Sequence, residues 1–212
     1  MQAMTNNLTQ EQILTHIQCV YQSEPEWDAA REVLLAVGGR AVPDLIATLA
    51  AELAPDPGLR LAKLLIQMGD PQALLALLVS SRRSRPIYPF VGTLLDKMTK
   101  RGSSQDIQIL MDVLGRAHPR WVGSAFLAEI SSYEAVQSAT ALVRIAERDP
   151  KPELRAAVPL LNFHLFSPVE FIALRKRLKR ALGEGTLPIP AFAENKTDSL
   201  PLPTQPEDNA AP

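Results

Sequence analysis

A proline recurs along this chain at nearly constant spacing, and this repetition restricts the fold more than any other feature. The intervals are 32, 29, 33 and 33 residues, and the prolines are Pro25, Pro57, Pro86, Pro119 and Pro152. Apolar or small residues follow each proline at offsets of two, five, eight and nine, which share one face of an α-helix. Proline is favoured at the start of a helix, because its missing N–H is not needed there. The pattern predicts one helix written five times, and a repeat of this length is typical of a solenoid.

Each repeat is expected to contain a leading helix, a tight turn and a second helix. The turn signals are glycine, serine and proline residues between apolar segments, at Gly38-Gly39, Gly69-Asp70-Pro71, Gly102-Ser103-Ser104, Ser131-Ser132 and Phe166-Ser167-Pro168. A further helix over residues 10–22 precedes the first repeat and is expected to cap it. We therefore predict an all-α fold, a right-handed α-solenoid of about five two-helix repeats with an N-terminal capping helix. Pro159 should kink the fifth leading helix.

Three segments follow from this pattern. Residues 1–23 are expected to form the cap helix, residues 24–183 the solenoid, and residues 184–212 an acidic, proline-rich tail. The tail has too few apolar residues to offset the entropy lost on ordering, so we predict that it is disordered. Its first part still contains Leu187, Ile189 and Phe192, which would suit a short docking segment.

Several stretches resemble HEAT repeats. They are residues 41–46 (AVPDLI), at the start of a second helix, residues 56–62 (DPGLRLA), at the start of a leading helix, and residues 68–74 (MGDPQAL), at the turn. The resemblance covers about residues 24–182 and is weakest in the third and fourth units. The second and fifth units are similar to the short bacterial repeats of bilin-lyase subunits. The resemblance implies a concave face, lined by the second helices, that binds partners.

The composition and the N-terminal sequence indicate which cellular location and which cysteine chemistry to expect. No apolar run approaches the ~20 residues needed to span a bilayer. The polar stretch Met1–Gln12 lacks the pattern of a signal peptide, so a cytoplasmic location is expected. The single cysteine, Cys19, excludes an internal disulfide and cysteine-based metal frameworks. Its neighbours in sequence offer nothing that would activate the thiol.

The charge is divided unevenly along the chain. Net charge is −5 over residues 1–80, +8 over residues 81–183 and −4 over residues 184–212, although the whole chain carries only −1. On the concave face that the resemblance implies, the candidate partner-binding residues are Arg144, Arg148, Arg175, Lys176 and Lys179. A second basic cluster, in the loop after the second repeat, contains Arg82, Arg83 and Arg85. Cations near helix C-termini also have a purely structural explanation, since each favours the helix dipole by ~0.3–1 kcal/mol.

No catalytic or cofactor motif stands out. The three histidines, His16, His118 and His164, lie in separate segments without metal-ligand spacing. The two tryptophans, Trp27 and Trp121, occupy the same repeat position as core leucines, so burial is favoured over base or pigment stacking. The sequence therefore predicts no catalytic residue, no metal site and no cofactor.

Four functional interpretations remain open. The leading one is a non-enzymatic scaffold or adaptor whose concave, partly basic face binds a protein partner and would suit an acidic one. The second is nucleic-acid binding, including the HEAT-like DNA glycosylase type, for which the basic rear half is the motive. The third, by family analogy alone, is a bilin lyase or chaperone related to phycobilisomes. In the fourth, the acidic tail folds back and masks the basic surface.

Overall fold

The structure is a computed structural model, and it describes residues 8–52, 54–117, 120–122, 125–127, 131–161 and 168–184. This part of the chain is almost wholly helical, which confirms the all-α prediction. The predicted tail lies outside the described residues from residue 185 onward. Trp121 belongs to a described strand, but its side chain is not described, and His118 and His164 also lie outside the described residues.

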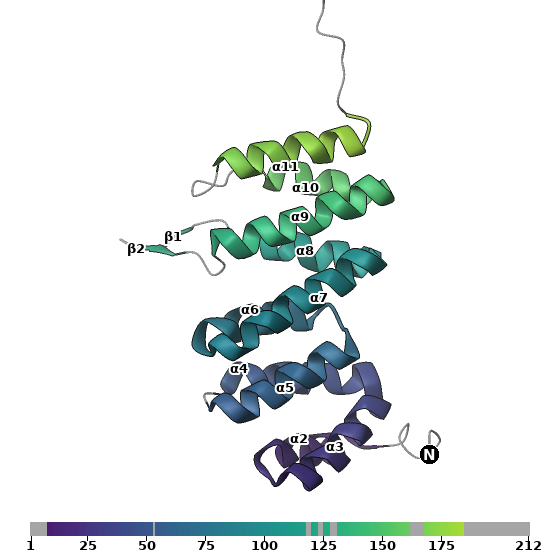
Figure 1. The fold of residues 1–212 in the computed structure, drawn as a ribbon, viewed down its shortest axis with the longest axis vertical. Helices are drawn as coiled ribbons and strands as arrows, with labels where there is room; N and C mark the ends of the chain where they lie inside the picture. Colours follow the sequence, from purple (N-terminus) through teal and green to yellow (C-terminus); the bar gives the residue numbers. More distant parts are fainter. Residues whose placement is uncertain are drawn as a thin grey trace, which may run out of the picture.

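Two short strands interrupt a long succession of helices (Figure 1). The α-helices are α2 (Gln10–Gln18), α3 (Glu24–Val37), α4 (Val42–Ala51), α5 (Pro55–Met68), α6 (Ala73–Arg83), α7 (Tyr88–Arg101), α8 (Ser104–Ala117), α9 (Ser132–Arg148), α10 (Ala157–Leu160) and α11 (Pro168–Ala181). Short 3₁₀ turns join several of them: η1 (Cys19–Tyr21), η2 (Gly38–Ala41), η3 (Arg85–Ile87) and η4 (Pro152–Ala156). The strands are β1 (Arg120–Val122) and β2 (Ala125–Leu127).

The helices lie in two rows along a single elongated body (Figure 1). The odd-numbered helices form one row, in which α3 packs on α5, α5 on α7, α7 on α9 and α9 on α11. The even-numbered helices lie behind them, where α2 contacts α4, α4 contacts α6, and α8 contacts η4 and α10. The chain therefore alternates between the rows from α2 to α11.

Helix ends follow the expected chemistry. Prolines stand in the first turn of α3, α4, α5 and α7, where their missing N–H costs nothing. Gly69 and Gly102 end α5 and α7 with φ of 67° and 59°, the left-handed conformation that glycine adopts without strain. Ser131 and Glu134 form a capping box at the start of α9.

One apolar core runs through the stack between the rows. The repeated helix face predicted from the proline register is buried at Trp27, Leu34 and Leu65, and again at Leu94 and Leu154. The burial of Trp27, at 3% exposure, agrees with its predicted core role. The corresponding residue of the third unit, Tyr88, differs, because 38% of its surface is exposed and its ring lies 6.2 Å from that of Tyr133.

The fourth leading helix is a wrong prediction. The described residues after Pro119 form two antiparallel strands, with Arg120 opposite Leu127, Trp121 opposite Phe126 and Val122 opposite Ala125. Valine, phenylalanine and tryptophan favour strands, and Gly123-Ser124 between them is typical of a two-residue hairpin turn. The proline spacing was compatible with either structure.

This hairpin changes the order of the last units. The hairpin takes no place in the alternation of helices. For this reason α9 lies in the row of the leading helices α3, α5 and α7, although α9 was predicted to be a second helix. The segment after Pro152 was predicted to be the fifth leading helix, yet η4 and α10 contact α8 in the other row. That segment is also short: η4 is a 3₁₀ turn, and α10, which contains Pro159, has four residues. In the third unit, Pro86 lies in η3, and Pro89 is the proline in the first turn of α7.

One stretch is long and apolar enough to cross a membrane by length and hydropathy alone. It lies within Glu24–Ala51, where an 18-residue window has a mean hydropathy of 1.6. In the structure this stretch is divided into α3, η2 and α4, and the division falls at Gly38, whose φ is 66°. Core helices of folded domains meet the same two criteria, so the stretch does not assign a location.

Candidate functional site

The basic cluster after the second repeat contributes largely to packing. Arg83, in the last turn of α6, donates a hydrogen bond to the carbonyl of Ala50 at 2.8 Å. Arg82 contacts the carboxylate of Glu134 at 3.2 Å, where the Glu134 side chain is only 5% exposed. Arg85, in η3, is exposed and has no ion-pair partner among the described residues. Two of the three predicted residues therefore join neighbouring helices.

Other cations of the rear half contact the C-terminal ends of helices in the preceding unit. Lys97 of α7 donates to the carbonyl of Ile66 at 2.7 Å, and Arg101 donates to that of Gly69 at 3.0 Å, both at the end of α5. Lys151, just after α9, reaches the carbonyl of Gly102 at 2.6 Å, at the end of α7. Carbonyls at a helix C-terminus lack a partner within their own helix, and they carry the negative end of its dipole. Much of the positive charge is thus used between units.

Arg101, itself exposed, also belongs to an ionic cluster around the buried Asp106 at the start of α8. Its Nε and Nη2 donate to the two carboxylate oxygens of Asp106 at 2.8 and 2.5 Å. The hydroxyl and the backbone N–H of Ser103 donate to the same carboxylate. Burial by itself raises the pKa of Asp106, but the hydrogen bonds from Arg101 and Ser103 outweigh it and leave that pKa below its usual value. The cluster therefore joins the end of α7 to the start of α8.

The basic residues of α11 point in different directions. Arg177 makes the ionic contact to α9, with its Nε and Nη2 at 3.0 and 2.9 Å from the Glu147 carboxylate. Arg175 and Lys179 are half-buried and lie on the other side of α11 from Arg177, since two residues turn a helix by about 200°. Lys176 is exposed. Arg177 therefore connects α11 to α9, although it was not among the site residues predicted from the sequence.

Arg144 and Arg148 lie on α9, beside α7. A Cβ atom placed on Gly102 would lie 2.7 Å from Nη2 of Arg148, so this guanidinium covers the end of α7. Arg144 is exposed and lines a groove between α7 and α9. Within the described part of the chain, Arg144 has no hydrogen-bond or ion-pair partner. Of the predicted site residues, Arg144 is the one that is exposed, lines a groove and has no partner in the described part of the chain.

The groove between α7 and α9, here called the α7–α9 groove, has a volume of about 260 Å³. Small side chains form much of its floor, and one acid and one base stand in it: Gly92, Leu95, Asp96, Thr99, Val136, Gln137, Thr140, Ala141 and Arg144. The hydroxyls of Thr99 and Thr140 donate to carbonyls of their own helices, so their donor groups are already used. A Cβ atom on Gly92 would meet nothing within 4 Å, which leaves open space there.

Two tyrosines stand at the N-terminal ends of the helices that form this groove. Tyr133 is 59% exposed, and its hydroxyl accepts a hydrogen bond from Nε2 of Gln137 at 3.2 Å. Partial burial, followed by the neighbouring Tyr133, raises the pKa of Tyr88 to about 12, so its phenol is neutral at physiological pH. The amide oxygen of Gln137 is buried and accepts no hydrogen bond within the described structure. The groove therefore offers polar and charged contacts, and the two tyrosines stand outside its lining.

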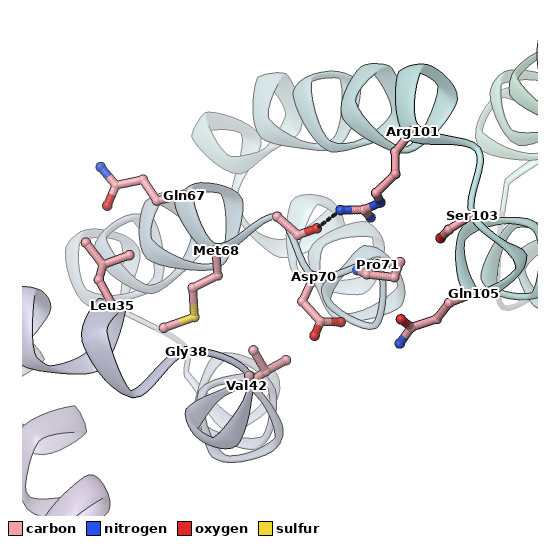
Figure 2. Close-up of a pocket in the computed structure, with 12 residues that line it drawn as sticks. Leu35, Gly38, Val42, Gln67, Met68, Asp70, Pro71, Arg101, Ser103 and Gln105 are labelled. Atoms are coloured by element: carbon pink, nitrogen blue, oxygen red, sulfur yellow. Dashed lines mark hydrogen bonds between the residues drawn. The ribbon is translucent and has the colours of Figure 1, made fainter. Parts of the chain in front are cut away.

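A second hollow lies along the turns of the first three units (Figure 2). Its volume is about 510 Å³, and it is lined by the turn residues Gly38, Gly69 and Ser103 together with Leu35, Val42 and Met68. The apolar side chains lie at one end and Asp70, Arg101, Ser103 and Gln105 at the other, as Figure 2 shows. Arg101 is already bound to Asp106 and to the Gly69 carbonyl, so little of its charge is available there. This hollow was not predicted from the sequence.

Chemistry at these surfaces is limited in the described residues. Among them, no group of three or more histidine, cysteine or acidic side chains could hold a metal ion. Cys19 is half-buried, and its thiol donates to the Thr15 carbonyl at 3.6 Å. The Ser103 hydroxyl, at the edge of the second hollow, is held by the Asp106 carboxylate within the ionic cluster.

Comparisons of the chain with protein-family models, with curated proteins and with solved structures found no match.

Proposed function

We propose that this protein is a HEAT-like α-solenoid adaptor that binds a protein partner in the α7–α9 groove. The two rows of alternating helices support this class, since stacked helix pairs build extended surfaces for partners. The contacts between cations and the ends of preceding helices support it further, because the same kind of connection recurs: Lys97 and Arg101 reach the end of α5, and Lys151 reaches the end of α7.

The single observation that carries the proposal is the charged pair in the groove. Asp96 and Arg144 line it from opposite helices, and neither has an ion-pair partner in the described part of the chain. Elsewhere in the rear half, Arg82, Arg101 and Arg177 are paired with acids. A groove with small side chains, one acid and one base would hold a polypeptide segment by its backbone and by charged side chains of both signs.

The alternative functions have less support from the geometry. Nucleic-acid binding needs many basic groups turned to solvent toward phosphates. Here Arg83, Lys97 and Lys151 donate to backbone carbonyls. A bilin-related role would need a cleft for an extended pigment. The α7–α9 groove, at about 260 Å³, is below the ~300–1,000 Å³ typical of small-molecule sites. The hollow along the turns, at about 510 Å³, is within that range, but its arginine is already bound to Asp106 and to the Gly69 carbonyl. Protein binding therefore remains the first proposal.

Affinity capture with variants of the groove tests the proposal. Full-length protein would be compared with Arg144→Glu, which reverses the charge, and with Gly92→Trp, which fills the open space above α7. The matched controls are Lys63→Glu, an exposed cation on α5, and Gly115→Trp, a helical glycine of α8 that also has open space at its Cβ. Circular dichroism would show whether each variant keeps its helical content.

We expect the groove variants to lose at least tenfold in recovery of specific proteins identified by mass spectrometry. The control variants should retain these proteins. If the groove variants and the controls recover the same proteins equally well, the assignment of the groove is wrong. Recovery of nuclease-sensitive nucleic acid, abolished by high salt, would favour the second interpretation instead.

A further inference from the structure

The last helix of the stack presents an apolar stripe on its outer side. Val169 is 78% exposed and Ile172 is 64% exposed, the highest values among the large hydrophobic side chains that the structure describes as exposed. The opposite side of α11 is buried at Phe171, Leu174 and Leu178 against the rest of the stack. A terminal helix needs a polar outer side if it faces water. The outer side of α11 is apolar instead, which is typical of a surface that another polypeptide segment covers.

The stripe has a basic margin. Lys176 and Arg180 are exposed and follow Ile172 at intervals of four, so they continue the same side of α11 toward its C-terminus. We call the surface formed by Val169, Ile172, Lys176 and Arg180 the α11 outer face. Its apolar part lies near the start of the helix and its basic part near the end.

The chain itself continues from the basic end of this face. Gly183 follows α11 with a φ of 72°, and the N–H groups of Gly183 and Glu184 donate to the carbonyls of Arg180 and Lys179. This pair of hydrogen bonds is a Schellman motif, which turns the chain away from the helix axis. The next residues are GTLPIPAF, with Leu187, Ile189 and Phe192 as their large apolar side chains.

We propose that residues 187–192 of this chain dock along the α11 outer face, running back from its C-terminal end. Pro188 and Pro190 favour an extended backbone, which rises about 3.1 Å per residue. From Glu184, Ile189 then reaches about 16 Å and Phe192 about 25 Å. At 1.5 Å per helical residue, Ile172 lies about 18 Å and Val169 about 22 Å back along α11. Ile189 therefore falls near Ile172, and Phe192 near Val169.

Charge and backbone chemistry agree with this occupant. Residues 185–193 contain no charged side chain, so docking this segment against Val169 and Ile172 buries no charge in the apolar part of the face. The two prolines have no N–H group, so two fewer backbone donors need partners when the segment lies against apolar side chains. The α11 outer face and the α7–α9 groove share no residue, so this inference and the proposed function can fail separately.

Disulfide trapping in the full-length protein tests the contact. In a Cys19→Ser background, Ile172→Cys combined with Ile189→Cys would be incubated with oxidised glutathione, which is reduced as the two thiols form a disulfide. The matched control combines Glu170→Cys with Ile189→Cys. Glu170 is exposed, and it lies only two residues from Ile172, about 160° around the helix. Mass spectrometry would separate intramolecular from intermolecular links.

We expect the pair at positions 172 and 189 to form the intramolecular disulfide at least tenfold faster than the pair at positions 170 and 189. Adding Phe192→Ala should reduce this preference, whereas Leu202→Ala, farther along the tail, should leave it unchanged. Equal rates for the two pairs would overturn the proposal. So would a predominance of intermolecular links through the cysteine introduced at position 172, which would assign the face to a second copy of this chain.

Discussion

The first and last helices of the stack bury similar apolar side chains on their inner sides, but they expose different side chains on their outer sides. At the first helix, α2, Ile13 and Ile17 are fully buried, and the exposed positions are mostly glutamine, glutamate and threonine. At the last helix, α11, Phe171 and Leu178 are buried in the same way, but the most exposed side chains include Val169 and Ile172. The first end of the helical stack exposes polar groups to water, as the outer side of a terminal helix should. The comparison shows that a terminal helix can be well buried against its inner neighbour and still expose apolar side chains on its outer side.

Removing a buried anchor at each end should give the largest effects, and similar ones. Phe171→Ala should lower the free energy of unfolding by about 3–5 kcal/mol and Ile17→Ala by about 2–5 kcal/mol, because each leaves a cavity in the core. Urea unfolding followed by circular dichroism measures both. Glu170→Ala and Gln18→Ala, exposed neighbours on the same helices, should change stability by no more than about 0.5 kcal/mol. A loss below about 1 kcal/mol for Phe171→Ala would mean that α11 is not anchored like α2.

In the centre of the stack, the charge of one buried side chain contributes to the free energy of unfolding, which gives a reference for the two ends. Asp106 is fully buried and bound by Arg101 and Ser103, so Asp106→Ala should cost about 2–3 kcal/mol at neutral pH. Its pKa is lowered on folding, so its contribution is fully present above the unfolded value of about 3.9 and is lost as the pH falls through the folded value. Urea titrations at a series of pH values should therefore show the stability difference between wild type and variant shrinking below about pH 4.

Asp112→Ala is the matched control for this reference. Asp112 is an exposed acid of the same helix, whose carboxylate accepts a hydrogen bond from Gln108 at 3.0 Å. Its replacement should change stability by no more than about 0.5 kcal/mol at neutral pH. If Asp106→Ala has a stability deficit that stays constant down to about pH 2, the ionic account of this joint is wrong.

Much of the helical framework could be predicted from local signals. The turn glycines Gly69 and Gly102 end α5 and α7 as expected, and the helix expected after the turn at Ser131-Ser132 corresponds to α9. These predictions depended on neighbouring residues only. The proline register failed at Pro119, because the residues that follow it satisfy a helical spacing and a strand composition equally well. Once the hairpin had replaced a helix, the row to which α9 belongs could not be predicted.

The candidate sites depended on contacts that no local signal contains. The sequence showed clusters of cations, but Arg83 and Lys97 donate to carbonyls 33 and 31 residues earlier in the chain. Only the stacking of units brings these groups together. The α7–α9 groove likewise needs two helices separated by α8 and the hairpin, so Arg144 could be singled out by its charge but Gly92 and Asp96 could not.

The smallest effect should distinguish the two ends most clearly. Leu14 of α2, 41% exposed, and Ile172 of α11 can both be changed to glutamine, whose helix propensity is close to that of leucine and slightly above that of isoleucine. Leu14→Gln should stay within about 0.5 kcal/mol of wild type. A bare Ile172 would behave in the same way, whereas an Ile172 covered by residues 187–192 should cost about 1–2 kcal/mol, because its burial would be lost. Combining Ile172→Gln with Ile189→Ala decides between these cases in urea titrations of the full-length chain. If the two side chains touch, the double variant loses less than the sum of the single losses, and if they do not, the losses add.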